Sequence, residues 1–388
     1  MTSGPAVYIN AWDVANALGG NRRTVANSLL AGHKGINGTW RVGGRDVPVA
    51  RLEVEPAALP DDLAPWESRN NRLVLHCLTP LKPQIEAALA KWGPRRLGVI
   101  IGTSTSGISE TEHALKRRAV TGEWPSGYRY SRQELGDTAA FAARVIGATG
   151  PCYAVSTACT SGVRAMISAV RLLRANLCDA VLCGGVDTLC DLTLQGFASL
   201  QSLSSGGCNP FSINRDGITI GEGGALFLLS RDESDLRVSG WGESSDAHHF
   251  SAPHPEGVGA RLAVSDALGR STYRPGDIAY INLHGTGTAL NDSVEAAVMH
   301  DIFGPETPCS STKGMTGHML GAAGSNEAAF LAIAMTHRKA LPHVWDGATD
   351  PSLSAIKLAT DETVDGRTML SCSYAFGGNN AAIILTRE

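Results

Sequence analysis

The sequence predicts an α/β fold, because short β-rich runs alternate along it with helix-forming runs of small residues. Two glycine-rich segments, GTSTSG (102–107) and GTGT (285–288), each close an apolar run, and a small-residue helix is expected in both parts of the chain. These repeated features indicate two similar halves in one compact body. A chain of 388 residues is long enough to bury a large core without disulfides or metals.

The expected strands are short apolar runs bounded by glycine or polar residues. In chain order they are 6–10, 97–103, 152–157, 179–186, 225–230, 278–285, 369–378 and 381–386. The polar stretch 231–250 lacks such a run, and we expect it to form the seam between two halves, 1–236 and 237–388.

Two helices are expected next to residues that could carry chemistry. Apolar residues recur at three-and-four spacing between Cys159 and Asn176, which predicts a helix that follows a strand and a sharp turn. A second helix is expected to begin near Ser325. Its face is formed by Phe330, Ile333, Ala334 and His337.

Composition excludes several classes of function. The 33 basic and 37 acidic residues give a net charge of −4, which argues against nucleic-acid binding. The nine cysteines are scattered without C-x-x-C pairs, as is typical of a protein in a reducing cytoplasm. The N-terminus lacks the pattern of a signal peptide, and every apolar run is too short to cross a bilayer. We therefore expect a soluble, cytoplasmic protein without membrane insertion.

Cofactor motifs are also missing from the sequence. Neither G-x-G-x-x-G after a strand nor G-x-x-x-x-G-K-[ST] occurs, so we expect no dinucleotide or nucleoside triphosphate site. His248, His249 and His254 are close in sequence, but their spacing fits no usual set of metal ligands, and we predict no metal.

Cys159 is a candidate nucleophile because it lies between a strand and a helix. Free amides and the helix dipole at a helix N-terminus favour a thiolate over a thiol. The alternative is that Cys159 is a small buried apolar residue, as most free cysteines are. Position alone does not separate the two.

Three further segments carry groups that could assist a nucleophile. His284 ends an apolar run in front of a glycine-rich segment, where its alternative role is that of a hydrogen-bonded structural histidine. His318 lies in a glycine-punctuated loop between Lys313 and Glu327. Phe376 lies in SYAFGGNN (373–380), where backbone amides could form an oxyanion hole.

Five motifs together resemble the β-ketoacyl-acyl-carrier-protein synthases of the condensing-enzyme family. They are STACTSG (156–162), NPFSINRDGITIGEGG (209–224), HGTGTALNDSVE (284–295), STKGMTGHMLGAAGSNE (311–327) and SYAFGGNN (373–380). Their order and spacing match those of the family over nearly the whole chain. The resemblance implies a thiolase-like fold, two duplicated halves in a five-layer αβαβα sandwich, and an intimate dimer.

The resemblance also implies the chemistry and the residues that perform it. The family carries out a decarboxylative Claisen condensation of an acyl thioester with malonyl-acyl-carrier-protein, with no metal or redox cofactor. By motif position Cys159 would be the acylated nucleophile, and the amides of Cys159 and Phe376 would form the oxyanion hole. His284 and His318 would bind the malonyl thioester carbonyl, while Lys313 would order the site electrostatically.

Supporting positions follow from the same resemblance. Glu327, Asp292 and Glu295 match buried acidic positions. Thr286 and Thr288 match threonines that contact the phosphopantetheine arm, and Phe376 matches a gate to the acyl pocket. Thr105 and Phe197 would border that pocket. The sequence departs from the family pattern at GTGTA (285–289), at Ala375 and at Asn379.

The partner implied is acyl carrier protein, which is acidic as a class, so a basic patch is expected near the mouth of the pocket. The candidates are Arg69, Arg72, Lys116, Arg117 and Arg118, with an ordinary solvated helix face as the alternative. The protein would be a homodimer, or a heterodimer with a chain-length partner that has no catalytic activity.

Three functions remain open at this stage. The first is elongation of a fatty acid, polyene (including aryl polyene) or polyketide-like chain by a type II synthase. The second is a chain-length or scaffold subunit, which typically lacks the nucleophile that this chain retains. The third is a thiolase-type acyltransferase or a cysteine hydrolase. A thiolase would need a second catalytic cysteine in a C-terminal glycine-rich motif, whereas Cys372 lies upstream of AFGG.

Overall fold

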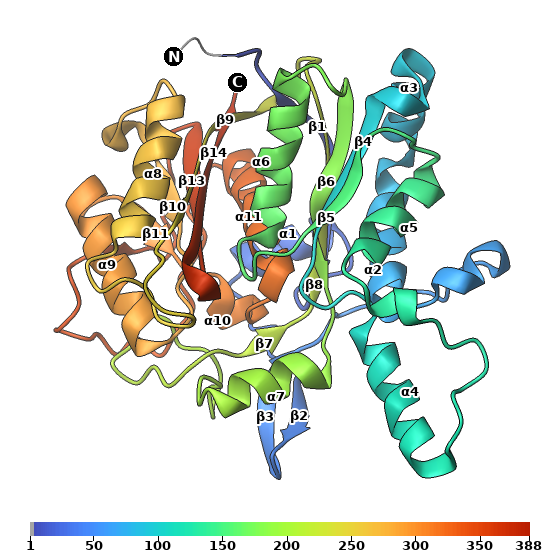
Figure 1. Ribbon diagram of the computed structural model, residues 1–388. Coiled ribbons are helices and arrows are strands. Elements are labelled where there is room, and N and C mark those ends of the chain that lie inside the picture. Colours follow the sequence, from blue (N-terminus) through green and yellow to red (C-terminus); the bar gives the residue numbers. More distant parts are fainter. Residues whose placement is uncertain (1–3) are drawn as a thin grey trace.

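Two mixed β-sheets alternate with three layers of helices in the computed structural model, which describes residues 4–388 (Figure 1). The first sheet contains β1 (Tyr8–Asn16), β4 (Leu97–Gly102), β5 (Cys152–Val155), β6 (Ala180–Asp187) and β8 (Gly223–Ser230). The second contains β9 (Leu236–Ser245), β10 (Tyr280–Asn282), β11 (Pro308–Ser310), β12 (Lys357–Leu358), β13 (Thr368–Ala375) and β14 (Asn379–Arg387). A separate small sheet consists of β2 (Gly38–Val42), β3 (Arg45–Ala50) and β7 (Ile220–Gly221).

The two large sheets have the same strand order. The first runs β5-β4-β6-β8-β1 and the second runs β11-β10-β13-β14-β9, with β12 added beyond β11. In each sheet the first three strands are parallel and the last two are antiparallel to their neighbours. Tyr8 and Arg237 are the one residue pair through which β1 and β9 join the sheets within residues 4–388. The chain is therefore a duplicated αβαβα sandwich, whereas its division into domains at 236/237 stays a prediction.

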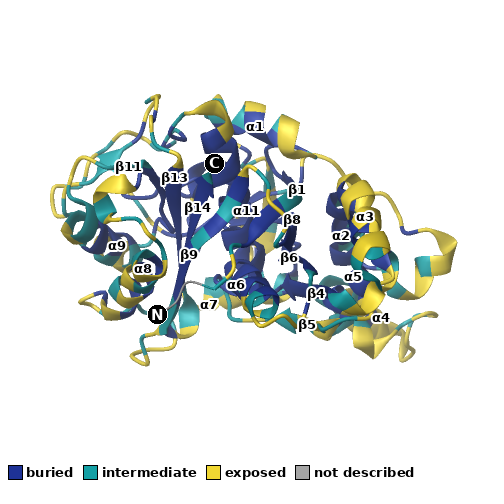
Figure 2. Cartoon of the chain, turned by 90° about the horizontal axis from the view of Figure 1, so that it is seen from above, coloured by how far each residue is buried: buried dark blue, intermediate teal, exposed yellow. Residues whose placement is uncertain are grey.

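The helices cover and separate these sheets (Figures 1 and 2). The outer layer on the first sheet contains α2 (Arg69–Leu78), α3 (Lys82–Trp92) and α5 (Gly136–Ile146), and that on the second contains α8 (Val258–Arg270) and α9 (Ala289–Phe303). The central layer contains α6 (Ser161–Arg174) and α11 (Ala323–His337). The shorter or peripheral helices are α1 (Arg22–Leu30), α4 (Ile108–Thr121), α7 (Asp191–Ser199) and α10 (Lys313–Thr316).

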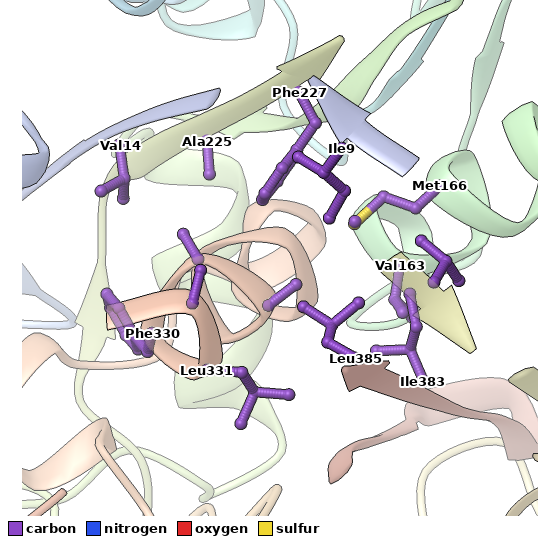
Figure 3. Close-up of a cluster of buried hydrophobic side chains, with 14 of the residues drawn as sticks. Ile9, Val14, Val163, Met166, Ala225, Phe227, Phe330, Leu331, Ile383 and Leu385 are labelled. Carbon is purple, nitrogen blue, oxygen red and sulfur yellow. The ribbon is translucent and has the colours of Figure 1, made fainter. Parts of the chain in front are cut away.

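Small residues allow the two central helices to pack closely. A Cβ atom on Gly162 of α6 would lie 2.8 Å from Ser325 Oγ and 2.9 Å from the carbonyl oxygen of Gly321. Apolar side chains from both sheets fill the rest of this layer, among them Phe227 of β8 and Ile383 of β14 (Figure 3). The close approach brings together the N-terminal ends of α6 and α11, where the candidate residues lie.

The sequence predictions for the elements hold with two exceptions. Each predicted strand overlaps an observed one, and the helix expected after Cys159 is α6. The first exception is the stretch 231–250, in which no strand was predicted but Leu236–Ser245 forms β9, the first strand of the second sheet along the chain. The glycines of β9 interrupt the apolar pattern that predicts a strand. Glycine is required at position 242, because a Cβ atom there would lie 1.9 Å from the carbonyl oxygen of Ala263 in α8.

The second exception concerns α11. The expected single face is wrong, because residues 323–335 are all buried, whereas His337 is exposed. A helix between two sheets is buried on every side, so it lacks the polar face of a surface helix. Within residues 4–388, we find no helix with the length and apolar character that a membrane span requires.

Candidate active site

Cys159 lies in a tight turn that leads from β5 into α6. Ala158 has a left-handed backbone conformation, with φ of 53°, which turns the chain sharply between strand and helix. Ser161 fastens the turn, since its hydroxyl donates to the carbonyl of Ala158 at 2.5 Å and accepts from the N–H of Thr157 at 2.9 Å. The sulfur is therefore held at the N-terminal end of α6.

Burial of the sulfur opposes the thiolate that the helix terminus is expected to favour at Cys159. Burial raises the pKa of Cys159 to about 12. Lys313 and the backbone N–H groups of Phe376 and Cys159 act in the opposite direction. These two amides face the sulfur, as donors of an oxyanion hole would.

His284 and His318 face the same sulfur from the second half of the chain. His318 Nε2 lies 3.0 Å from Cys159 Sγ, and one nitrogen of each ring lies within 4.8 Å of the sulfur and of the other. The rings pack edge to face, with centroids 5.4 Å apart. Three side chains from widely separated segments thus converge on one point.

Hydrogen bonds to the far side of each ring fix the tautomers. The N–H of Leu320 donates to His318 Nδ1 at 3.1 Å, so the proton of the neutral ring is on Nε2. Lys313 Nζ lies 3.4 Å from His284 Nδ1 and donates to the carbonyl of His284 at 2.5 Å. Because a lysine ammonium only donates, His284 also carries its proton on Nε2.

Both rings are neutral at physiological pH. Burial, and then the positive charge of Lys313, hold the pKa of His284 and of His318 well below the usual 6.5. Each ring consequently offers an N–H donor without a net charge. This is suited to hydrogen bonding an oxygen that gains negative charge.

Lys313 and Glu327 form an ion pair behind the imidazoles. Both side chains are 1% exposed, and Nζ of Lys313 contacts Oε1 of Glu327. Burial raises the pKa of the Glu327 carboxyl, and Lys313 opposes that shift. The pair places a positive charge beside His284 while the carboxylate balances it.

Two buried carboxylates on α9 hold the loop that carries His284. Glu295 accepts the N–H groups of His284 and Gly285, each at 2.7 Å. Asp292 accepts the N–H groups of Thr286 and Gly287 at 3.1 and 3.2 Å. Both carboxylates therefore position the backbone and do not contact the sulfur.

A cavity of about 390 Å³ leads to the sulfur from the surface. Cys159, His284 and His318 line its inner end, and Thr286, Thr288, Phe197 and Phe376 line it as well. The hydroxyls of the two threonines are 2.9 Å apart, and the two phenylalanine rings have centroids 5.5 Å apart. The cavity thus gives a bound molecule access to the thiol and to both imidazoles.

Thr105 does not line this cavity, and its place beside an acyl pocket stays a prediction. Its hydroxyl and N–H both donate to Asp187 Oδ1, at 2.8 and 2.9 Å, and it is 1% exposed. Asp187 also accepts from Thr103 and Ser104. Sequence reasoning missed Asp187, although an acid at the end of an apolar strand was a usable signal.

None of the five predicted cations lines the cavity, and the patch expected near its mouth stays a prediction. Arg69 pairs at 2.7 Å with Glu222, whose side chain is buried, and Arg72 pairs with Glu67. The remaining three are on α4, where Lys116 pairs with Asp191 and Arg118 lies 4.4 Å above the ring of Trp124.

Two other contributors were missed. The ring of Tyr374 packs edge to face on His284, with centroids 6.0 Å apart, and lines the cavity. Its signal was an aromatic residue beside AFGG. The N–H of Leu320 carried no signal in the sequence, because any residue supplies a backbone amide.

The absence of a metal stays a prediction. Cys159, His284 and His318 are close enough to share an ion. To bind one, each ring would have to lose its proton from Nε2.

Comparison with known proteins identifies relatives over the whole chain. Residues 85–234 match the model of the β-ketoacyl synthase N-terminal domain, and residues 236–345 match that of the C-terminal domain. A 3-oxoacyl-[acyl-carrier-protein] synthase 2 of Staphylococcus aureus is 27% identical, over 100% of this chain and 99% of that protein.

Two solved complexes share the fold. One is a ketosynthase in complex with its chain length factor from Xenorhabdus doucetiae, with a TM-score of 0.95, 42% identity and coverage of 99% and 98% of the two chains. The other is a type II polyketide synthase acyl carrier protein in complex with its ketosynthase, with a TM-score of 0.87, 22% identity and coverage of 99% and 100%. The second likeness establishes the fold alone.

Proposed function

The chain belongs to the β-ketoacyl synthase family and is a condensing enzyme, and from this premise we propose that it is the catalytic ketosynthase subunit of a heterodimer. Its partner would be a chain length factor, and its substrates would arrive on acyl carrier protein. The product would be a polyene or polyketide-like chain. The observation that carries this proposal is the convergence of Cys159, His284 and His318 at the inner end of one cavity.

The first step transfers the primer to the enzyme. Cys159 sulfur attacks the acyl thioester, the bond between the acyl carbon and the carrier sulfur breaks, and the thiol proton leaves with the carrier thiol. The N–H groups of Phe376 and Cys159 stabilise the tetrahedral oxyanion. His318 donates from Nε2 and therefore stabilises negative charge on the sulfur without accepting its proton.

The second step forms the new carbon–carbon bond. The N–H groups of His284 and His318 donate to the malonyl thioester oxygen, which gains charge as the carboxylate leaves as carbon dioxide. The enolate carbon then attacks the acyl-cysteine carbonyl, and Cys159 departs as a thiolate. Neutral rings serve this step best, because a donor without charge does not bind the malonyl carboxylate that has to leave.

The buried acids and Lys313 act through these residues. Glu295 and Asp292 hold the 284–287 backbone, so that His284 keeps its direction. Lys313 fixes the tautomer of His284, and Glu327 keeps that lysine in place. The threonines at 286 and 288 would hydrogen-bond the phosphopantetheine arm in the cavity.

The edge strand β5 supports pairing with a second chain. Within residues 4–388 it pairs only with β4, and its other edge is free. Cys152 is exposed, Tyr153 is 39% exposed, and the strand carries no charge that would prevent pairing with another strand. The 42% identity to a chain of a ketosynthase–chain length factor complex favours a chain length factor, over a second copy of this chain, as the partner that pairs with this edge.

The nine free thiols support a location in a reducing cytoplasm.

The two alternatives fit less well. A scaffold subunit has no need of a cysteine with two imidazoles and two amides directed at it. A thiolase would need a second cysteine beside the first, but Cys372 is fully buried and does not line the cavity. Both observations favour the condensing reaction.

Intact-protein mass spectrometry tests the proposal. The purified protein, alone and with its chain length factor, is mixed with acyl carrier proteins that bear different acyl groups, and malonyl carrier protein is then added. We expect an acyl adduct on the wild type and on Cys152→Ser, but not on Cys159→Ala, and its discharge as a β-ketoacyl product. An adduct on Cys159→Ala, or none on the heterodimer, would contradict the assignment.

A further inference from the structure

Helix α7 forms part of the wall of the cavity that leads to Cys159. Its last turn and the residues that follow line the cavity, namely Phe197, Leu200, Gln201 and Ser202. The ring of Phe197 packs against that of Phe376, with centroids 5.5 Å apart. Phe376 also supplies a backbone N–H that faces the sulfur. A shift of α7 would therefore move a residue of the oxyanion hole.

Little of α7 is anchored in the core. The helix spans nine residues, and Leu194 is the one among them that is buried. A helix of this length is marginal without contacts to other elements. Its N-cap residue, Cys190, makes no side-chain hydrogen bond to the free amides of the first turn. The position of α7 therefore depends on groups from outside the helix.

Glu112 of α4 supplies the missing cap. Its two carboxylate oxygens accept the N–H of Asp191 at 2.9 Å and the N–H of Leu192 at 2.6 Å. These are the first two amides of α7, and a negative charge at a helix N-terminus also interacts favourably with the helix dipole. One side chain on α4 thus holds the end of α7 that lies away from Phe197.

Two further groups hold the side chain of Asp191. Lys116, one turn after Glu112 on α4, forms an ion pair with it, and Trp40 of β2 donates from Nε1 to Asp191 Oδ1 at 2.8 Å. The side chain of Lys116 is 64% exposed, so its ion pair contributes little. Glu112 is half-buried and bonds the backbone directly, which makes it the main link between α4 and α7.

We propose that Glu112 is a positioning residue for acyl loading, because its cap on α7 holds Phe197 against Phe376 and so keeps the Phe376 amide directed at the sulfur. The inference rests on the proposed function, in which this amide stabilises the oxyanion of the loading step. Decarboxylation relies instead on His284 and His318. Loss of the cap should therefore slow the first step alone.

Separate measurements of the two steps in the heterodimer test this role. Loading is followed by single-turnover mass spectrometry with an acyl thioester of N-acetylcysteamine, and decarboxylation by carbon dioxide release from the malonyl thioester without a primer. These small donors remove any effect of α4 on carrier protein. Glu112→Ala should slow loading about five- to tenfold, as expected for the loss of a helix cap, and should leave decarboxylation within about twofold.

Two variants serve as controls for this measurement. Glu112→Gln keeps one acceptor oxygen for the amides of α7, so it should restore part of the loading rate that Glu112→Ala loses. Glu86→Ala removes an exposed glutamate from α3 and should change neither step.

A double variant shows whether Glu112 acts through Phe197. Phe197→Ala removes the ring contact itself and should slow loading by a similar factor, so adding Glu112→Ala to it should change loading less than about twofold further. Effects that multiply, equal slowing of both steps by Glu112→Ala, or unchanged loading would each overturn the positioning role. A wild-type heterodimer that forms no acyl adduct would instead overturn the proposed function.

Discussion

The two halves of the molecule have the same strand order but make unequal contributions to the site. In the first half, the loop after β5 supplies Cys159, while the loops after β4 and β6 supply no group at the sulfur. In the second half, the loops after β10, β11 and β13 bring His284, His318 and Phe376 to that sulfur. All of these loops follow strands of the three-stranded parallel part of a sheet. Duplication thus supplied one scaffold, and the loops determined the chemistry.

The corresponding loops after β4 and β10 show how the halves diverged. The first, at 103–105, donates its hydroxyls and amides to Asp187 at the end of β6. The second, at 284–287, donates its amides to Asp292 and Glu295 of α9. Both loops are held by buried carboxylates, but only the second presents a side chain to the substrate. A rigid backbone therefore comes with the fold, whereas function depends on the residue placed on it.

The largest expected effects come from variants of Cys159 and His284, because the first half should carry out acyl loading and the second half decarboxylation. Cys159→Ala should abolish the acyl adduct and lower condensation at least about a thousandfold, but should still release carbon dioxide from malonyl carrier protein, because both imidazoles remain. His284→Ala should keep the adduct and lower decarboxylation about a hundred- to a thousandfold through loss of one oxyanion donor. Mass spectrometry and carbon dioxide release measure the two steps.

His284→Asn is the control for this division, since it keeps an N–H donor and should retain more decarboxylation than His284→Ala. If Cys159→Ala and His284→Ala lose both steps equally, the halves do not divide the reaction in this way.

Much of this comparison could be predicted from the sequence. Motifs with fixed spacing located Cys159, His284 and His318, and they implied the duplicated fold. The pKa of Cys159 could not be predicted, because the sequence places the sulfur at a helix N-terminus but does not show the burial that raises the pKa of the thiol. The ion pairs of the predicted cations could not be foreseen for the same kind of reason. Arg69 is charged in any sequence, but only the fold shows that Glu222 pairs with it.

The buried ion pairs provide the next effect, on stability. Glu327→Gln leaves Lys313 charged and fully buried, and should lower the free energy of unfolding by about 3–5 kcal/mol. Glu222→Gln in the first half should cost less, about 1–2 kcal/mol, because Arg69 retains Glu55 and a side chain that is 25% exposed. Urea unfolding of the two variants measures the difference. Equal losses of unfolding free energy would mean that breaking the Lys313–Glu327 pair costs no more stability than breaking the more exposed Arg69–Glu222 pair.

The smallest effect is the pH dependence, which should differ between the two steps. The pKa of Cys159 is raised to about 12, so its thiolate fraction grows about tenfold per pH unit throughout the neutral range. Acyl loading should therefore accelerate up to about a hundredfold from about pH 6.5 to 8.5. Decarboxylation should stay flat over the same range, since the pKa values of His284 and His318 lie well below 6.5 and both rings keep their Nε2 protons throughout. Single-turnover loading and carbon dioxide release by Cys159→Ala measure the two profiles separately. A loss of decarboxylation on acidification with a midpoint near 6.5 would show that an imidazole titrates there, and would remove the argument that the second half works with neutral donors.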